Sequence, residues 1–277
     1  MIGDSGANYL DGSGGDDVLT GGAGADTLIG GAGSDTADYS TAGSGVTANL
    51  ASAASNTGDA AGDSYSGIEN LTGSGFNDSL TGDSGANVLT GGAGDDMLIG
   101  GAGGDTLIGG AGTADTVSYA GSAAVTLDLS AATGTGSTGD AAGDTLNGIE
   151  YVVGSSNGDS FTVSQSQGWH VDGGAGNDTV TLANNSGSVT EADLLSFLTN
   201  VETIDFGGTN VQGNLTMDAS TIQSLVGAGN SSHLIINLDG DDSLAISGAA
   251  FYTQVGSDYT FYSDGSHTTQ IGQLTVT

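Results

Sequence analysis

The chain of 277 residues contains no lysine, no arginine and no cysteine. Its 33 acidic residues therefore face no basic side chain except three histidines, and the formal net charge at pH 7 is -33. Nucleic acids and anionic membrane surfaces are poor partners, because proteins neutralise phosphate groups with lysine and arginine. The absence of cysteine excludes disulfide bonds and thiolate metal sites. The missing counter-charge points to an inorganic cation.

Long apolar runs and aromatic residues are also scarce. No run of about 18 apolar residues occurs, so the sequence predicts no membrane insertion. The start, MIGDSGANYL, lacks the basic and apolar regions of a cleaved secretory signal. Aromatic residues make up 5% of the chain, and 53 residues are glycine. Such a composition is typical of disorder, but the regular order of the residues favours a folded chain.

A nine-residue pattern repeats through the N-terminal part. Each unit reads Gly, a small residue, any residue, Gly, any residue, Asp, any residue, an apolar residue and any residue. Strong copies fill residues 3–38 and 73–117, where GGAGTADTV carries one extra residue before its acid. Weaker copies are GDAAGDSYS (58–66), GDAAGDTLN (139–147), GSSNGDSFT (154–162) and GGAGNDTVT (173–181). A fixed short period is the signature of a solenoid.

A longer repeat of roughly 80 residues is built from these units. Residues 21–96 and 100–178 share one order: two good nonapeptides, a tyrosine with an apolar alternation, GDAAGD, Gly-Ile-Glu and further nonapeptides. The Gly-Ile-Glu pieces, residues 67–72 and 148–153, are interpreted as six-residue connectors that place the next repeat in phase. The chain is therefore a tandem of two supra-repeats.

Each nonapeptide predicts a six-residue turn and a three-residue strand, so two consecutive units form one complete coil. Stacked coils pair their strands in parallel, about 4.8 Å apart. Glycines in the turns supply backbone conformations that other residues disfavour. The eighth residue of each unit is expected to point inward and form a thin core: Leu10, Leu19, Leu28, Leu80, Leu89, Leu98, Leu107, Phe161 and Val180.

The sixth residue of each unit is usually an aspartate, and its carboxylate decides which ligand the unit can bind. Acids that lie two units apart, such as Asp17 and Asp35, are expected to stack one above another. Two carboxylates about 5 Å apart repel by roughly 3 kcal/mol at an effective dielectric constant of about 20. One buried leucine contributes about 2 kcal/mol, whereas ordering a residue's backbone costs on the order of 1 kcal/mol. A calcium ion reverses this balance, because it binds the oxygens that aspartates and glycine-rich turns supply.

The predicted calcium ligands are therefore the sixth residues of the units. They are Asn8, Asp17, Asp26, Asp35, Asp63, Asp78, Asn87, Asp96, Asp105, Asp115, Asp144, Asp159 and Asp178. Asn8 and Asn87 replace the acid, Phe76 and Asn157 replace the fourth glycine, and Ala37 replaces the inward leucine. We expect these sites to bind calcium more weakly or to use another ligand.

The units GGAGADTLI, GGAGDDMLI and GGAGGDTLI resemble the nonapeptide of the repeats-in-toxin (RTX) family, over about residues 3–181. The stretch VSQSQGWHVD (163–172) departs from the pattern. The resemblance implies a parallel β-roll with several calcium ions, in a bacterial protein that is secreted or held at the cell surface. The predicted fold is an all-β solenoid, with the roll over residues 1–182 and a mixed, β-rich capping and secretion domain over residues 183–277.

In the last part, TEADLLSFL (190–198) and DASTIQSLVG (218–227) predict short helices. HLIINL, SLAISG, AFYTQV, YTFYSD and TQIGQLTVT predict strands separated by short turns. Together they predict a cap on the edge of the roll. NVETIDF, LDGDDSLAIS and the final LTVT resemble the C-terminal regions of RTX adhesins, which implies an uncleaved signal for the type I secretion machinery.

The sequence does not indicate an enzyme. GSSNG at 154–158 fits the nucleophile pattern of esterases, but it lies in register with the nonapeptide that contains Asp159. His170 lies beside Trp169, which favours a packing role, and no His-Glu-x-x-His motif occurs.

Three functions are compatible with these features. The first is a secreted structural protein that self-associates head to tail, or attaches to the cell surface, as a filament, S-layer or matrix. The second is the export end of a large RTX adhesin, and the third is the accessory roll of an RTX enzyme. The first is favoured because the roll begins at Gly3 without a cap, which leaves an open strand edge.

Overall fold

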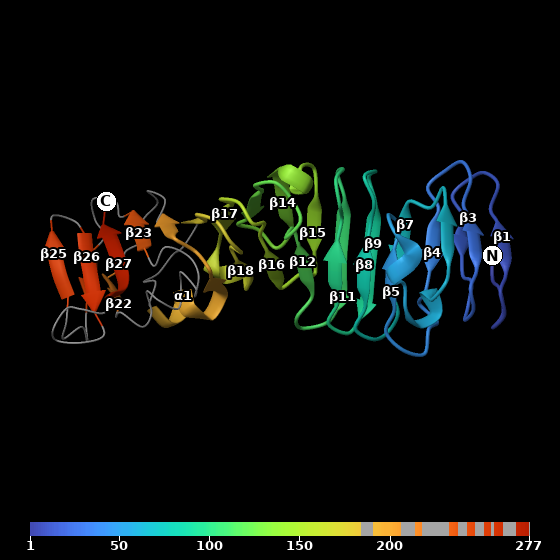
Figure 1. The fold of residues 1–277 in the computed structure, drawn as a ribbon, viewed down its shortest axis with the longest axis horizontal. Helices are drawn as coiled ribbons and strands as arrows, with labels where there is room; N and C mark the ends of the chain where they lie inside the picture. Colours follow the sequence, from blue (N-terminus) through green and yellow to red (C-terminus); the bar gives the residue numbers. More distant parts are fainter. Residues whose placement is uncertain are drawn as a thin grey trace. The chain divides into compact units, whose positions relative to one another are not determined.

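A computed structural model describes residues 1–183 and 191–205, and the strands at residues 214–217, 233–237, 243–246, 252–255, 258–262 and 270–276. The chain divides into two compact units. Unit 1 comprises residues 1–119 and 133–152, and unit 2 comprises residues 120–132 and 153–277. Short β-strands dominate both units (Figure 1).

Unit 1 consists of short strands that stack side by side, from blue to green in Figure 1. They are β1 (Tyr9–Asp11), β2 (Val18–Leu19), β3 (Thr27–Ile29), β4 (Thr36–Asp38), β5 (Thr47–Asn49), β6 (Ser64–Ser66), β7 (Asn70–Thr72), β8 (Ser79–Thr81), β9 (Val88–Ala93), β10 (Met97–Ile99), β11 (Thr106–Ala111), β12 (Thr116–Ser118), β14 (Gly134–Thr138) and β15 (Thr145–Asn147). Short 3-10 helices lie at Ala53–Ser55, Gly58–Ala60 and Gly139–Ala141.

The strand register confirms a coil of two nonapeptides. Leu10 of β1 pairs with Leu28 of β3, and Leu89 of β9 pairs with Leu107 of β11, each partner lying two nonapeptides further along the chain. The strands β2, β4, β7, β9, β11 and β15 form one parallel row, and β5, β8, β10 and β12 form another. Unit 1 is thus a parallel β-roll, as the period predicts.

The eighth residues form the predicted thin core. The side chains of Leu19, Leu28, Leu89 and Leu107 are fully buried. Each contributes about 2 kcal/mol of hydrophobic stabilisation. Leu10 is only half-buried, because β1 is the end strand of its sheet and has a partner on one side only.

The two Gly-Ile-Glu pieces are more than connectors, which corrects the interpretation made from the sequence. β7 follows Glu69 directly and pairs in parallel with β4 and β9, so this piece forms a full rung of the roll. β16 (Tyr151–Val153) follows Glu150 in the same way. Each piece is therefore a shortened repeat, in which a turn of three residues replaces the usual six.

Unit 2 continues the parallel pattern in β13 (Thr126–Leu129), β17 (Ser160–Val163), β19 (Thr179–Leu182) and β21 (Thr203–Asp205). The irregular stretch 163–172 contains a 3-10 helix (Gln165–Gln167) and β18 (His170–Asp172). Trp169 is buried, and its indole N–H donates to the carbonyl oxygen of Ala131 at 3.0 Å. The packing role expected for the neighbouring His170 stays a prediction.

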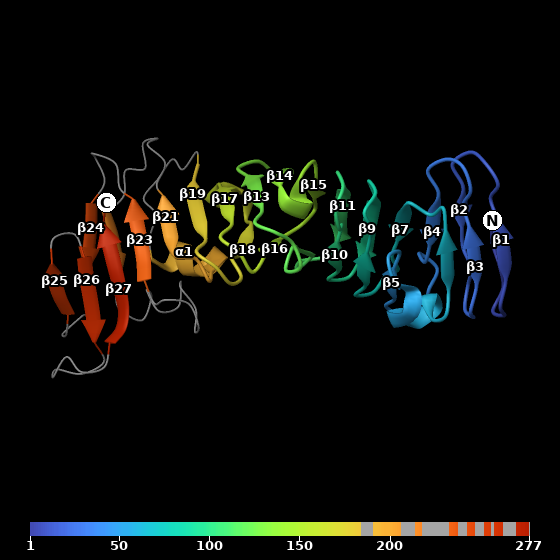
Figure 2. The same ribbon diagram turned by 45° about the horizontal axis from the view of Figure 1, so that its top comes forward.

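The predicted helix at 190–198 is confirmed as α1 (Glu191–Phe197), although Leu198 already belongs to β20 (Leu198–Thr199), which pairs with β18. The predicted helix at 218–227 lies outside the described residues. Figure 2 shows α1 beside the strands of unit 2. Within the described ranges, no helix is long and apolar enough to cross a membrane.

All five predicted C-terminal strands are present. They are β23 (His233–Asn237), β24 (Ser243–Ile246), β25 (Tyr252–Val255), β26 (Asp258–Tyr262) and β27 (Gln270–Val276), and β22 (Asn214–Met217) pairs with β24. β21, β23 and β27 pair in parallel, whereas β25, β26 and β27 pair antiparallel. This is the expected mixed, β-rich region. β19 ends at Leu182 and pairs in parallel with β21, so the parallel sheet includes strands on both sides of the predicted boundary. A domain boundary between residues 182 and 183 stays a prediction.

Candidate metal sites

The sixth residues of the units stack in columns held by backbone hydrogen bonds. In eight of the acids, Oδ1 accepts the N–H of the sixth residue in the neighbouring coil, as from Asn8 to Asp26 at 2.7 Å and from Asp96 to Asp115 at 2.8 Å. Equivalent bonds join Asp17 to Asp35, Asp26 to Asp63, Asp78 to Asp96, Asn87 to Asp105, Asp105 to Asp144, and Asp159 to Asp178. Oδ1 of Asp78 and Asp159 instead accepts the N–H of Val46 and Val125, both at 2.7 Å. One oxygen of each acid that accepts such a bond therefore has a structural role.

The second oxygen differs from position to position. In seven acids, Oδ2 is buried and has no hydrogen-bond partner: Asp17, Asp26, Asp35, Asp96, Asp105, Asp115 and Asp178. Six of them, all except Asp17, are at most 1% exposed. An ionised oxygen that is buried without a partner costs several kcal/mol. These oxygens therefore require either a proton or a cation.

In the units that contain these seven acids, the glycine at the first position leaves room at this oxygen. A methyl carbon built on Gly91 would overlap Oδ2 of Asp96 and the carbonyl oxygen of Gly109 in the next coil. Carboxylate and peptide oxygens thus converge where a side chain would otherwise lie. In the described part of the chain, no three His, Cys, Asp or Glu side chains form one cluster. An ion would therefore use one or two carboxylates together with peptide oxygens, a donor set that suits calcium.

The electrostatics of the columns favour a cation. Burial, followed by repulsion from Asp78 and Asp115, raises the pKa of Asp96 to about 6. Burial, with repulsion from other column carboxylates, also raises the pKa of both Asp105 and Asp178 to about 7. Without a metal these carboxyl groups retain protons to a higher pH than ordinary aspartates do, and a divalent cation would favour their ionised form.

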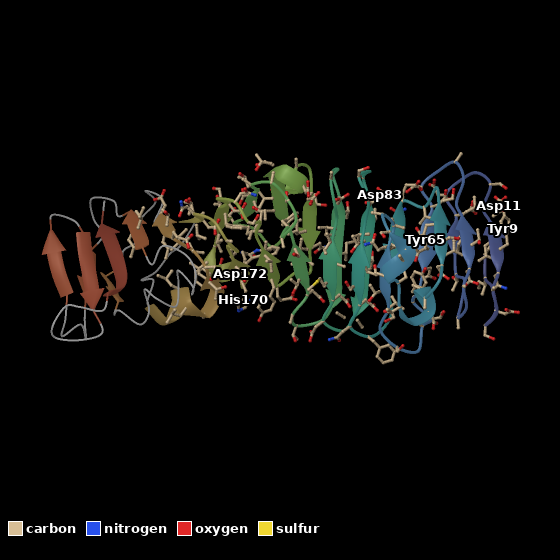
Figure 3. All side chains as sticks on the ribbon, in the orientation of Figure 1. Tyr9, Asp11, Tyr65, Asp83, His170 and Asp172 are labelled. Carbon is tan, nitrogen blue, oxygen red and sulfur yellow. The ribbon has the colours of Figure 1, made fainter. Side chains whose placement is uncertain are left out.

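Two column acids are satisfied by tyrosine instead. The hydroxyl of Tyr39 donates to Oδ2 of Asp63 at 2.7 Å, and that of Tyr119 donates to Oδ2 of Asp144 at 2.8 Å. Both tyrosines are buried. Tyr65, which is labelled in Figure 3, lies 2.6 Å from the Tyr39 hydroxyl. A calcium ion at these two acids would have to displace a buried phenol.

Two further acids are satisfied by serine. Asp78 accepts the backbone N–H of Ser74 on Oδ2 at 2.5 Å and its hydroxyl on Oδ1 at 2.8 Å. Ser155 makes the same pair of bonds to Asp159, at 2.6 and 2.9 Å. The GSSNG segment is thus a turn of the roll in which Ser155 hydrogen-bonds to Asp159, the acid of the same unit.

The two asparagines bind their own turns. Oδ1 of Asn8 accepts the N–H of Asp4, and Oδ1 of Asn87 accepts the N–H of Asp83, both at 2.8 Å. Figure 3 labels Asp83 in the turn beside β9. Nδ2 of Asn87 donates to the carbonyl oxygen of Glu69 at 2.7 Å. An amide therefore keeps the column continuous without adding charge.

The sequence analysis missed three column members. Oε2 of Glu69, Glu150 and Glu202 accepts the N–H of the preceding column acid at 2.8 to 2.9 Å. A signal was present, because each glutamate stands two residues before an inward apolar residue, as the aspartates of the nonapeptides do. The roles of Tyr39 and Tyr119 were also missed, although both recur at one place in the supra-repeat.

The profile of the RTX calcium-binding nonapeptide repeat matches the chain in four copies, at residues 2–37, 63–98, 81–113 and 170–184. No curated protein matches the chain. The matched segments contain all seven acids with an unpartnered oxygen except Asp115. Repeats of this family bind several calcium ions per domain, and proteins that carry them are typically secreted by bacteria. The chain therefore contains RTX calcium-binding nonapeptide repeats in these segments.

Proposed function

We propose that the chain is a secreted structural protein whose roll folds outside the cell when calcium enters the columns. The seven buried, unpartnered carboxylate oxygens carry this proposal, because no lysine or arginine exists to neutralise them. The ions would be held by Asp17, Asp26, Asp35, Asp96, Asp105, Asp115 and Asp178, together with peptide oxygens of the turns. Extracellular calcium modules bind with dissociation constants of about 0.1 to 1 mM. Such sites stay empty until the chain leaves the cell.

We further propose that the folded roll assembles head to tail with a second copy. In the sheet β1-β3-β6, strand β1 has one free edge. The same coil exposes large apolar side chains, with Ile2 83%, Tyr9 68% and Val18 53% exposed. A free parallel edge recruits another strand unless proline or lysine blocks it, and the chain has neither. Head-to-tail contacts that do not close into a ring extend into filaments.

Electron microscopy and light scattering of the intact chain, in millimolar calcium and in chelator, test the assembly. We expect filaments in calcium only. A Tyr9→Lys variant at the end strand should suppress them, whereas Val88→Lys, at the equivalent position of the interior strand β9, should not. A chain that stays monomeric at high concentration in calcium contradicts this proposal and favours the adhesin alternative.

That alternative, the export end of a large RTX adhesin, is favoured by the mixed strands of the C-terminal region, and the RTX family is associated with type I secretion. Deleting the segment 218–277 should trap the chain inside the cell. Secretion of the truncated chain by a type I system would place the export signal elsewhere. The accessory roll of an RTX enzyme, the remaining alternative, requires a catalytic domain in a longer protein.

A further inference from the structure

Three short turns in the chain share one geometry. They are Gly67-Ile68-Glu69, Gly148-Ile149-Glu150 and Asn200-Val201-Glu202. The first residue of each has a left-handed backbone, with φ of 57°, 61° and 51° respectively. The second residue is buried, at 5%, 6% and 0% exposed. The third is a glutamate that directly precedes a strand of the roll. Asparagine tolerates the left-handed region best after glycine. The third turn therefore has the same backbone geometry as the other two, with a different sequence.

The glutamate enters the column in place of an aspartate. Its Oε2 accepts the N–H of Asp35, Asp115 or Asp178 at 2.9, 2.9 and 2.8 Å. A turn shortened by three residues changes the path of the backbone beside the column. The additional methylene of glutamate extends its carboxylate to the oxygen position that aspartate fills elsewhere. This accounts for glutamate at all three places in a chain that has only four.

Each glutamate lies beside an aspartate whose Oδ2 is buried without a hydrogen-bond partner. Asp35, Asp115 and Asp178 are 0% exposed, and Oδ2 of each has no hydrogen-bond partner. A methyl carbon built on the glycine that opens the facing unit would overlap this Oδ2 and a peptide oxygen of the short turn. The overlaps are at Gly30 with the oxygen of Gly67, at Gly109 with that of Gly148, and at Gly173 with that of Asn200.

We propose that each short turn completes a calcium site. Its ligands are the glutamate carboxylate, the peptide oxygen of the left-handed residue and Oδ2 of the facing aspartate. The proposal rests on calcium binding by the columns, and it adds a glutamate turn of three residues to the glycine-rich turn of six. Glu150 and Glu202 lie outside the segments that the family profile matches.

A purely structural glutamate would not explain the arrangement. Accepting one N–H requires only a neutral amide oxygen, as Asn8 and Asn87 show for their own turns. A second carboxylate beside a buried acid costs free energy unless a cation lies between them. The charge of glutamate is useful here only when an ion binds.

Glutamine variants separate the two roles, because the amide of glutamine still accepts the N–H. The experiment counts calcium ions per chain by native mass spectrometry at saturating calcium for E69Q, E150Q, E202Q and the triple variant. We expect each single variant to lose one ion and the triple variant to lose three. E191Q, which removes the fourth glutamate on α1, is the matched control and should lose none. A folded triple variant with the full number of ions overturns the proposal.

A measurement on the intact chain covers the case in which the triple variant does not fold. Because the chain has four glutamates, selective labelling with 13C at the glutamate carboxyl gives a simple infrared spectrum. In calcium, three quarters of the labelled signal should shift to the frequency of a calcium-bound carboxylate. An unshifted signal at saturating calcium contradicts the proposal. Neither measurement depends on export or assembly, so both remain informative if the proposed function fails.

Discussion

Asp105 and Asp144 are neighbours in one column and differ in how the second carboxylate oxygen is satisfied. The backbone N–H of Asp105 donates to Oδ1 of Asp144 at 2.7 Å, and the strands that follow pair Leu107 with Leu146. Oδ2 of Asp105 is buried without a partner, whereas Oδ2 of Asp144 accepts the hydroxyl of Tyr119. The same backbone frame thus satisfies a carboxylate in two ways, with an external cation or with a phenol that the chain carries.

The first supra-repeat contains the same pair. Asp26 has an unpartnered Oδ2, and Asp63 in the next coil is bonded to Tyr39. Each supra-repeat therefore has one column acid satisfied by a tyrosine and one satisfied by a serine, next to acids that need an ion. This difference predicts which parts of the roll respond to calcium.

Removing calcium should have the largest effect. One ion at about 100 times its dissociation constant adds roughly 2.7 kcal/mol, so several ions together approach the roughly 5–15 kcal/mol by which a typical domain is stable. In excess chelator we expect loss of the far-UV β-signal, and hydrogen exchange should be slowest near Asp63 and Asp144. A β-spectrum that chelator leaves unchanged would show that the fold does not need calcium.

A change of pH should act in opposite directions with and without calcium. Burial raises the pKa of Asp96, Asp105 and Asp178 in the folded chain above that in the unfolded chain. In chelator, their contribution to stability is therefore full below about pH 4 and is lost as the pH rises to about 7. Acidification from pH 7.5 to 5 should restore β-structure in chelator and weaken calcium binding otherwise. Circular dichroism with calcium titration at both pH values measures this.

Replacing single column residues should give graded losses. Asp96 contacts Asp78 on one side and Asp115 on the other, so Asp96→Ala should weaken sites in two coils and remove on the order of 3 kcal/mol at saturating calcium. Asn87→Ala loses hydrogen bonds worth about 1 kcal/mol each but no charge. Calcium titration of both variants decides the matter, since equal losses in affinity would mean that the sixth position is not a principal ligand.

Removing one phenol hydroxyl should have the smallest effect. Tyr119→Phe leaves Oδ2 of Asp144 without its donor, which should cost about 1.5–3 kcal/mol in chelator, since the acceptor is charged. In calcium we expect an ion to bind at the vacated position and recover most of this loss. Thermal unfolding with and without calcium, together with the number of bound ions, tests the exchange. An equal loss under both conditions would mean that the tyrosine and the cation do not replace one another.

The sequence alone determined the coil and the core. Because the period of nine brings every second inward residue to the same place on the next coil, the pairs Leu10–Leu28 and Leu89–Leu107 followed from counting. The stacking of the sixth residues followed for the same reason, and the excess of acid over base required a cation. These features are local and periodic, so a linear pattern contains them.

Only the tertiary structure decided how each carboxylate is satisfied. Tyr39 lies 24 residues from Asp63, and Glu69 lies 34 residues from Asp35, so insertions of irregular length separate partners that the fold brings together. The nine-residue period did not identify Gly-Ile-Glu as a rung either, because its short turn breaks that period and leaves only the spacing from glutamate to the next inward residue as a signal. The stacking of the coils decided this, because it places β7 between β4 and β9, and β7 pairs in parallel with both.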